Sequence, residues 1–362
     1  MTTFLQLHVL TTYAASNLNR DDTGRPKTLN FGGVERLRIS SQSLKRALRT
    51  SDIFAEAIGD ARGIRSNSFT EALVGVLRAR GLADDDIVKS VSAVIEKDKL
   101  GKSKKDKPTD TEQLVHLGPE ELLRLEGLAD RLIAGDALAD KEALVLVQKP
   151  RAADIALFGR MLADNPGFNV EAAAQVAHAF TTHRVSVEDD FYTAVDDLKS
   201  ANRDADRGAG FIGVQEYGSG VFYLYVCLDA SLLVGNLAGD KVLAAKTAEA
   251  LVDAVTTVSP KGKQNSFASR AHASFALAEM GSKTPRSLAA AFLKPVGPGD
   301  GANDFGAASK KQLLDLRAKF DGIYGQCWDK DATLDIFAEA SSSNNLAALK
   351  ALAREAVDAV HL

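Results

Sequence analysis

The sequence predicts an α+β fold, a strand-and-helix core interrupted by two excursions. Period-two alternation of apolar residues predicts strands near both ends of the chain. Residues 66–185 have helical spacing without a strong strand signal, and two strand-like runs between Tyr192 and Tyr223 predict a protruding hairpin with a flexible tip. The order strand, strand, helix, large insertion, strand, helix, strand fits a ferredoxin-like or RNA-recognition-motif-like (RRM-like) core.

The first predicted strand lies at the amino end of the chain. Leu5, Leu7 and Val9 share one face of this strand, whereas Gln6 and His8 share the other. Such alternation is typical of a half-buried strand.

A second strand and a helix follow. Arg36 and Arg38 alternate with apolar residues, so both guanidinium groups are expected on the outward face. Ser40 or Ser41 is a good N-cap, and the apolar spacing after it predicts one amphipathic helix that runs towards Ile58.

The later elements are predicted from caps and apolar runs. Helix starts are expected at Asp84 or Asp85, at Pro119 and at Asp140. After the hairpin the sequence predicts a strand over 221–228, a helix over 240–258 and a strand over 266–279, with helices and loops beyond.

The composition excludes several classes of protein. The longest apolar run, over 242–258, is interrupted by three charged residues and is no membrane span. The amino end lacks the pattern of a secretory signal, so a cytoplasmic protein is expected. Cys227 and Cys327 are the only cysteines, and they suggest neither a disulfide framework nor a thiolate metal site.

The charge is distributed unevenly. The net charge is −4, which on its own argues against nucleic acid. Residues 20–49, however, carry eight basic side chains and only three acidic ones, a patch that would confine polyanion binding to one face. Six further lysines between Lys97 and Lys107 are interpreted as a mobile, solvated loop.

The helix after Ser40 combines several features of an anion site. Its free N–H groups, serine hydroxyls and dipole converge at the helix start. Gln42, Lys45, Arg46 and Arg49 form one polar face that could follow a nucleic-acid backbone. A capped helix with a solvated basic face explains the same spacing, and this alternative stays open.

Collinear blocks of the sequence closely resemble the CasC family, the backbone subunit of the type I-E CRISPR Cascade complex in the RAMP superfamily. The resemblance covers residues 1 to about 230 and is weaker beyond. The blocks that carry it are Asn17 to Asp22, Phe31 to Gly33, Arg38 to Ala47, Asp154 to Met161, Ala177 to His183, Phe191 to Leu198 and Gln215 to Tyr223.

The resemblance implies a hand-shaped protein. An RRM-like palm would comprise residues 1–60, 184–191 and 224–362. Helical fingers would occupy residues 61–183, and a β-hairpin thumb residues 192–223.

The resemblance also implies a non-catalytic function without cofactor or metal. Copies would stack as a helical homo-oligomer along a CRISPR RNA and present it for pairing with target DNA, a division of labour known from RNA-guided systems. Further partners would be the cap protein, the small and large subunits and the guide-processing endonuclease, with no membrane involved.

Ten residues are candidates for RNA contact. Carried over from the family, Met161, Tyr192 and Ile212 would stack on bases regardless of sequence. Without the family, Met161 and Tyr192 would be read as core residues. The candidates contributed by the palm are Arg20, Arg38, Ser40, Gln42, Lys45, Arg46 and Arg49.

Two other functions remain as alternatives. Asp189, Asp190, Asp196 and Asp197 lie near His183 in the sequence and could hold Mg²⁺ for a ribonuclease, although Asp-Asp pairs are usually solvated caps. The other alternative is an oligomeric scaffold whose basic patch meets acidic proteins and no nucleic acid.

Overall fold

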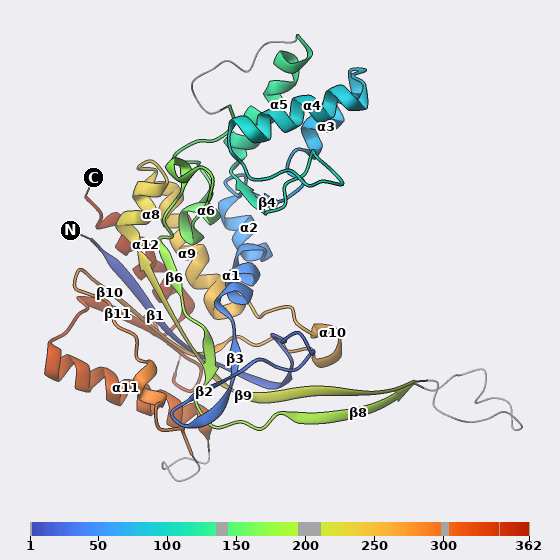
Figure 1. The fold of residues 1–362 in the computed structure, drawn as a ribbon. Coiled ribbons are helices and arrows are strands. Elements are labelled where there is room, and N and C mark those ends of the chain that lie inside the picture. Colours follow the sequence, from blue (N-terminus) through green and yellow to red (C-terminus); the bar gives the residue numbers. More distant parts are fainter. Residues whose placement is uncertain (1, 135–143, 195–210, 298–303, 340, 362) are drawn as a thin grey trace, which may run out of the picture.

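The computed structural model describes residues 2–134, 144–194, 211–297, 304–339 and 341–361. Within these ranges the strands form a nine-stranded sheet in which every pairing is antiparallel (Figure 1). Helices pack on both faces of this sheet. The mixed composition of helices and strands expected from the sequence is confirmed.

The strands follow the order β11-β10-β1-β9-β7-β3-β2, and β6 and β8 also pair with β9. Most of the sheet is therefore built from segments that are far apart in the chain. The bounds are β1 Phe4–Ser16, β2 Thr28–Phe31, β3 Val34–Ile39, β6 Ala174–Val176, β7 Ala179–Thr181, β8 Glu188–Ala194, β9 Phe211–Asp229, β10 Ala273–Gly281 and β11 Lys330–Asp335.

The larger hydrophobic core lies between one face of the sheet and a layer of helices. Leu5, Leu7 and Val9 of β1 point into it, as their alternation predicts. The helices of this layer are α1 Ser41–Arg49, α2 Asp52–Ile58, α6 Ala153–Phe158, α8 Ala230–Asn236, α9 Lys241–Thr257 and α12 Leu346–Asp358.

The opposite face of the sheet is also covered. The short helix η2 (Ala289–Phe292) and the long helix α11 (Phe305–Tyr324) pack there against residues of β9 and β10. Gln6 and His8 of β1 therefore lie buried beneath this second layer. The expectation of a half-buried strand is wrong for this reason.

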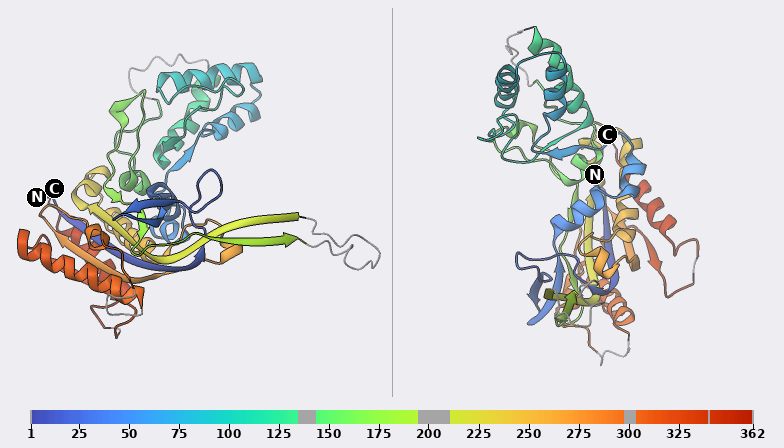
Figure 2. Two further views of the ribbon diagram at one scale, coloured as in Figure 1. Left: turned by 60° about the horizontal axis from the view of Figure 1, so that its bottom comes forward. Right: turned by 90° about the vertical axis from the view of Figure 1, so that its right-hand side faces the viewer.

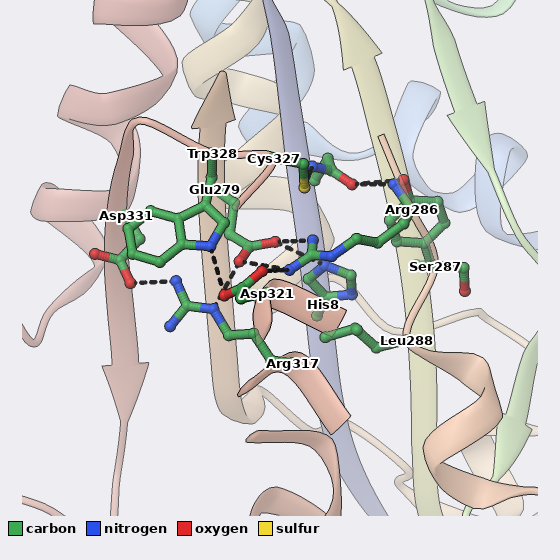
Figure 3. Close-up of polar contacts among 12 residues, drawn as sticks. His8, Glu279, Arg286, Ser287, Leu288, Arg317, Asp321, Cys327, Trp328 and Asp331 are labelled. Atoms are coloured by element: carbon green, nitrogen blue, oxygen red, sulfur yellow. Dashed lines mark hydrogen bonds and ion pairs between the residues drawn. The ribbon is translucent and has the colours of Figure 1, made fainter. Parts of the chain in front are cut away.

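Beneath α11, a polar network joins the sheet to this second layer (Figure 3). His8 Nε2 lies 3.3 Å from an oxygen of Glu279, which also accepts hydrogen bonds from Arg286 and Arg317. On its other side, His8 Nδ1 lies 3.0 Å from the hydroxyl of Tyr223. Glu279 and His8 are both fully buried, so these partners replace water.

Arg36 also lies beneath the second layer, whereas it was expected on an exposed face. Its guanidinium donates to the carbonyl oxygens of Thr181 and Phe292, at 2.9 Å each, and the residue is fully buried. Burial lowers the pKa of this side chain. Arg36 therefore does not belong to the exposed basic patch, and the prediction that its side chain faces outward is wrong.

The helix expected to run from Ser40 towards Ile58 is two helices. Ser40 caps α1 as predicted, with its hydroxyl accepting from the N–H of Ser43 at 3.3 Å. A second cap at Ser51 then starts α2. After the break, α2 packs against α9, whereas α1 also contacts β6.

Residues between α2 and α6 form a helical insertion with its own core. Leu73, Leu77 and Leu125 are among its fully buried residues. The predicted starts at Asp84 and Pro119 are confirmed, and Asp140 lies outside the described residues. The bounds are β4 Ile64–Ser66, paired with β5 Val115–Leu117, and α3 Glu71–Ala79, α4 Asp84–Lys97 and α5 Pro119–Ile133.

The expectation that residues 66–185 hold no strong strand is wrong. Strands β6 and β7 lie within this stretch and pair with β9 in the main sheet, and β5 of the insertion lies within it and pairs with β4. All three are only three residues long. The predicted strand over 266–279 begins later, at Ala273, because the helical turn α10 (Gln264–Phe267) precedes it.

The predicted hairpin is present in the described residues and projects from the body of the molecule (Figure 2). Strand β8 pairs with the first part of β9. Strand β9 is 19 residues long in all, and its later part lies in the centre of the sheet, where it pairs with β1. The predicted tip, residues 195–210, lies outside the described residues.

Both cysteines are buried free thiols. Burial raises the pKa of Cys227 to about 11. No helix in the described ranges has the length and apolar character needed to cross a membrane.

Candidate nucleic-acid interface

Three segments meet at the start of α1. The loop of residues 17–26 is fixed to the helix because Asn19 Oδ1 accepts from the N–H of Ser40 at 2.8 Å. The segment of residues 259–270 packs against the same loop, so tightly that a Cβ on Gly262 would lie 2.2 Å from the carbonyl oxygen of Leu18. Only glycine fits this close approach of two backbones.

A hollow of about 390 Å³ lies between these segments and is lined by Arg20, Arg46 and Lys261. All three side chains are exposed. No described residue engages any of them in a hydrogen bond or an ion pair. Asp21 is the one acidic residue of the lining, and hydrogen bonds from Thr23 lower its pKa and occupy its carboxylate.

A second hollow, of about 190 Å³, continues from the first because Arg20 lines both. Its other walls include Lys263 and, from β8 of the hairpin, Tyr192. Arg25 on its rim is neutralised by Glu216 at 2.5 Å. The two hollows together are named the cationic trough, formed by Arg20, Arg46, Lys261, Lys263 and Tyr192.

The cationic trough unites three residues predicted from the sequence, Arg20, Arg46 and Tyr192. Lys261 and Lys263 were not predicted as site residues. The residues of α1 are recognised by their helical spacing. Lys261 and Lys263 have no such spacing, because they lie in the irregular segment between α9 and α10. Their place opposite α1 arises from tertiary packing alone.

The other predicted residues of this region lie beside the trough. Gln42 is exposed on α1, and burial lowers the pKa of the half-buried Lys45. Ser40 is buried and its hydroxyl caps the helix. Arg38 lies 3.0 Å from His178 Nδ1, and Arg49 points to Asp154.

The two faces of the hairpin differ. Tyr192 lies opposite Gly213, whereas Thr193 lies opposite Ile212, so Tyr192 and Ile212 point to opposite faces. Phe191 and its partner Val214 share the face of Ile212. All three of these apolar side chains are exposed.

Neither Met161 nor Tyr192 is a core residue. Met161 follows α6 and has 82% of its surface exposed, and Tyr192 has 44% exposed. The interpretation of both as packing residues is wrong. Met161 is not part of the trough lining.

Of the residues considered for a metal site, the described ones are exposed or engage protein groups. Asp189 and Asp190 are exposed on β8, and Asp196 and Asp197 lie outside the described residues. His183 Nδ1 donates to the carbonyl oxygen of Arg184, and its Nε2 accepts from the N–H of Val221. Among the described residues no group of three or more His, Cys, Asp or Glu side chains could hold a metal ion.

Comparison with solved structures shows what this architecture resembles. One matching chain, from a structure described as a CRISPR RNA-guided surveillance complex, pre-nicking, has a TM-score of 0.80 and 30% identity, with 98% of this chain and 99% of that chain covered. A second, described as a CRISPR RNA-guided surveillance complex, has a TM-score of 0.60 and 25% identity, with the same coverage. No curated protein matches the sequence.

A family model described as CT1975-like protein matches residues 5–359, and the chain belongs to this family. The family resemblance drawn from the sequence blocks is thereby confirmed. It also extends further than those blocks, because both the family model and the matched structures include the part of the chain beyond residue 230.

Proposed function

We propose that this protein is a component of a CRISPR RNA-guided surveillance complex, and in particular the non-catalytic subunit that binds the guide along its backbone. The cationic trough carries this proposal. Three exposed cations, none of them paired with a described residue, face one hollow on a chain whose net charge is −4. Such a site suits phosphates, and Tyr192 beside it offers a ring on which a base can stack.

The match to chains of CRISPR RNA-guided surveillance complexes supports the choice of RNA as the ligand. In this proposal Arg20, Arg46, Lys261 and Lys263 neutralise guide phosphates. The neighbouring Arg38, Ser40, Gln42 and Lys45 add polar contacts from the sheet edge and α1. Base pairing between guide and target supplies the sequence recognition that a backbone-binding site lacks.

The assembly is proposed to be of type I-E in the RAMP superfamily and to act in the cytoplasm. The sheet and its covering helices are assigned to an RRM-like palm, the helical insertion to the fingers and the β8-β9 hairpin to the thumb. Ile212 and Met161 would meet bases or neighbouring copies along the guide. The partners are CRISPR RNA, further copies of this chain, target DNA through the guide and the other subunits of the complex.

The test compares RNA binding by matched charge variants. The double variant Arg46→Gln/Lys261→Gln removes two cations of the trough, and the double variant Lys246→Gln/Lys319→Gln removes two exposed lysines elsewhere. For single strands, each phosphate contact adds about 0.7 to the slope of log affinity against log salt. We expect the first variant to lose affinity and slope, and the second to behave as the original protein.

Three outcomes would contradict the proposal. Equal RNA affinity of both double variants would show that the trough does not contact RNA. A protein that acquires no RNA when expressed with a CRISPR transcript, judged by its 260/280 nm absorbance ratio, would fit the protein scaffold. Labelled RNA cleaved on incubation with Mg²⁺ would fit the nuclease.

A further inference from the structure

The chain leaves the sheet layer for the helical insertion and returns from it at one junction. At this junction the N–H of Ala153 donates to the carbonyl oxygen of Ala61 at 2.8 Å. Asp154, in the first turn of α6, is fully buried, and its Oδ1 accepts from the N–H of Gly63 at 2.8 Å. A Cβ on Gly63 would lie 2.8 Å from the carbonyl oxygen of Leu117, so the outgoing chain also packs closely against β5 of the insertion.

The second oxygen of Asp154 joins two further elements. His116 Nε2, from β5 of the insertion, lies 2.9 Å from Oδ2, and Arg49 Nη1, from the last turn of α1, lies 3.4 Å from it. Burial would raise the pKa of Asp154, but the hydrogen bond with His116 and the neighbouring positive charge of Arg49 hold it below the usual value. One buried carboxylate therefore connects α1, the insertion and α6.

Other buried carboxylates hold the insertion together internally. Asp98 accepts hydrogen bonds from the N–H groups of residues 144–146. The fully buried Glu121 accepts hydrogen bonds from the N–H groups of Gly118 and Val147, at 2.8 Å each, and its ion pair with Arg160 at 2.7 Å ties the insertion to the segment that follows α6. Because the insertion is braced in this way, a change in the contacts of Asp154 would turn it as a unit.

We propose that Asp154 is a positioning residue that sets the orientation of the helical insertion relative to α1, and that Arg49 serves this junction instead of contacting a phosphate. Removing one partner of a buried charge pair leaves the other without compensation, so the carboxylate favours the arrangement that keeps all its partners. The side chain of Arg49 is only 18% exposed, whereas Arg46, one turn earlier, is exposed to the trough. The consequence for RNA rests on the proposed function, but the geometry concerns the protein alone.

The orientation can be measured without RNA. Spin labels on Ala93→Cys in α4 and Ala318→Cys in α11 occupy exposed helical positions on the insertion and on the sheet layer. We expect Asp154→Asn to shift or broaden the distance distribution between the labels. Asp110→Asn is the control, because it changes a buried carboxylate of the insertion that lies away from the junction.

Two further variants keep the test decisive if Asp154→Asn does not fold. Arg49→Gln and His116→Ala each remove one partner and leave the backbone hydrogen bonds to Asp154 in place. Both are expected to broaden the same distribution. Distances that stay unchanged in all folded junction variants would overturn the proposal.

RNA binding separates the two roles of Arg49. Arg46→Gln is the matched control, from the same helix, and is expected to lower the salt slope by about 0.7. Arg49→Gln is expected to weaken binding with the slope unchanged. A slope lowered as in Arg46→Gln, with unchanged distances, would make Arg49 a phosphate contact. If the original protein binds no RNA, the proposed function fails, and the distances still decide the role of Asp154.

Discussion

At the scale of single residues, Gly213 gives Tyr192 its place on the hairpin. A Cβ at this position would lie 2.6 Å from Cζ of the Tyr192 ring. The ring therefore lies across the glycine, on the face of the hairpin that borders the trough. A glycine in mid-strand is a common sign of such a close approach.

We predict that Gly213→Ala displaces the ring of Tyr192 and weakens RNA binding. Stacking of a base on an aromatic ring contributes about 1–3 kcal/mol, which is the largest loss expected. The measurement is the affinity for labelled RNA, with the unfolding midpoint as a check on folding. Gly167→Ala is the control, because an added methyl group there meets no atom within 4 Å. Equal RNA affinity of the two variants would show that the ring of Tyr192 does not stack on RNA.

The sequence predicts the burial and the hydrogen bonds of a residue well where these depend on a single helix or strand. The cap at Ser40 and the buried positions of α1 follow from local spacing. The burial of Arg36 does not, because it depends on Phe292, 256 residues further along the chain. Lys261 was missed for the same reason, since its neighbours in the trough come from the other end of the chain.

At the scale of elements, α11 is attached to the sheet through charged groups as well as through apolar packing. Arg317 of α11 donates to Glu279 of β10 at 2.7 Å and lies over the ring of Trp328 at 4.1 Å. Asp321, one turn later, accepts from Trp328 Nε1 at 3.1 Å (Figure 3). Ionisation of this network therefore affects the docking of the helix.

We predict that acid destabilises the protein in two steps. Burial lowers the pKa of His8 below 6.5, so the unfolded state takes up a proton that the folded state does not, and stability falls as the pH drops below this value. Burial would raise the pKa of Glu279, but hydrogen bonds from His8 and Arg286 bring it to about 2. The stability due to Glu279 is therefore complete above pH 4.5, its ordinary pKa, and is lost below it.

The check is the free energy of unfolding by urea between pH 7 and pH 3. Each group contributes a slope of at most about 1.4 kcal/mol per pH unit. His8→Gln should remove the decline that begins near pH 6.5, and Glu279→Gln the decline below pH 4.5. Profiles that stay parallel to that of the original protein would show that the network does not govern the acid response.

Elements with strong caps or long periodic runs were predicted closely, as α4, α5 and α9 illustrate. Strands β6 and β7 were missed because alternation cannot be recognised in three residues. The sequence predicts one helix after Ser40 because the apolar spacing continues across Ser51. The structure has two helices, because the side chain of Ser51 caps the start of α2.

At the scale of the whole molecule, the helical insertion and the sheet have separate hydrophobic cores that share no residue. The residues of the insertion core lie between Phe69 and Leu162, whereas the main core combines residues from both ends of the chain. The sequence predicted this division into a core and a helical excursion. It could not place β6 and β7 in the sheet, because their partners in β9 lie 41 to 54 residues further along.

We predict that Leu73→Ala destabilises the insertion without unfolding the sheet. Leu73 is fully buried in the insertion core, and such a truncation costs about 2–5 kcal/mol. Hydrogen exchange should accelerate at amides of α3 and α5 and stay slow at those of β1 and β9. Uniform acceleration across the protein would show that the two cores unfold as one.

The continuity of β9 has a mechanical consequence. The strand that forms the projecting hairpin is the same strand that lies between β1 and β7 in the sheet. A pull on the hairpin along its length is therefore carried by one uninterrupted backbone to the ladder with β1. There it loads many hydrogen bonds at once in shear, the direction in which a ladder resists best, so the sheet can bear tension applied at a distance without peeling open.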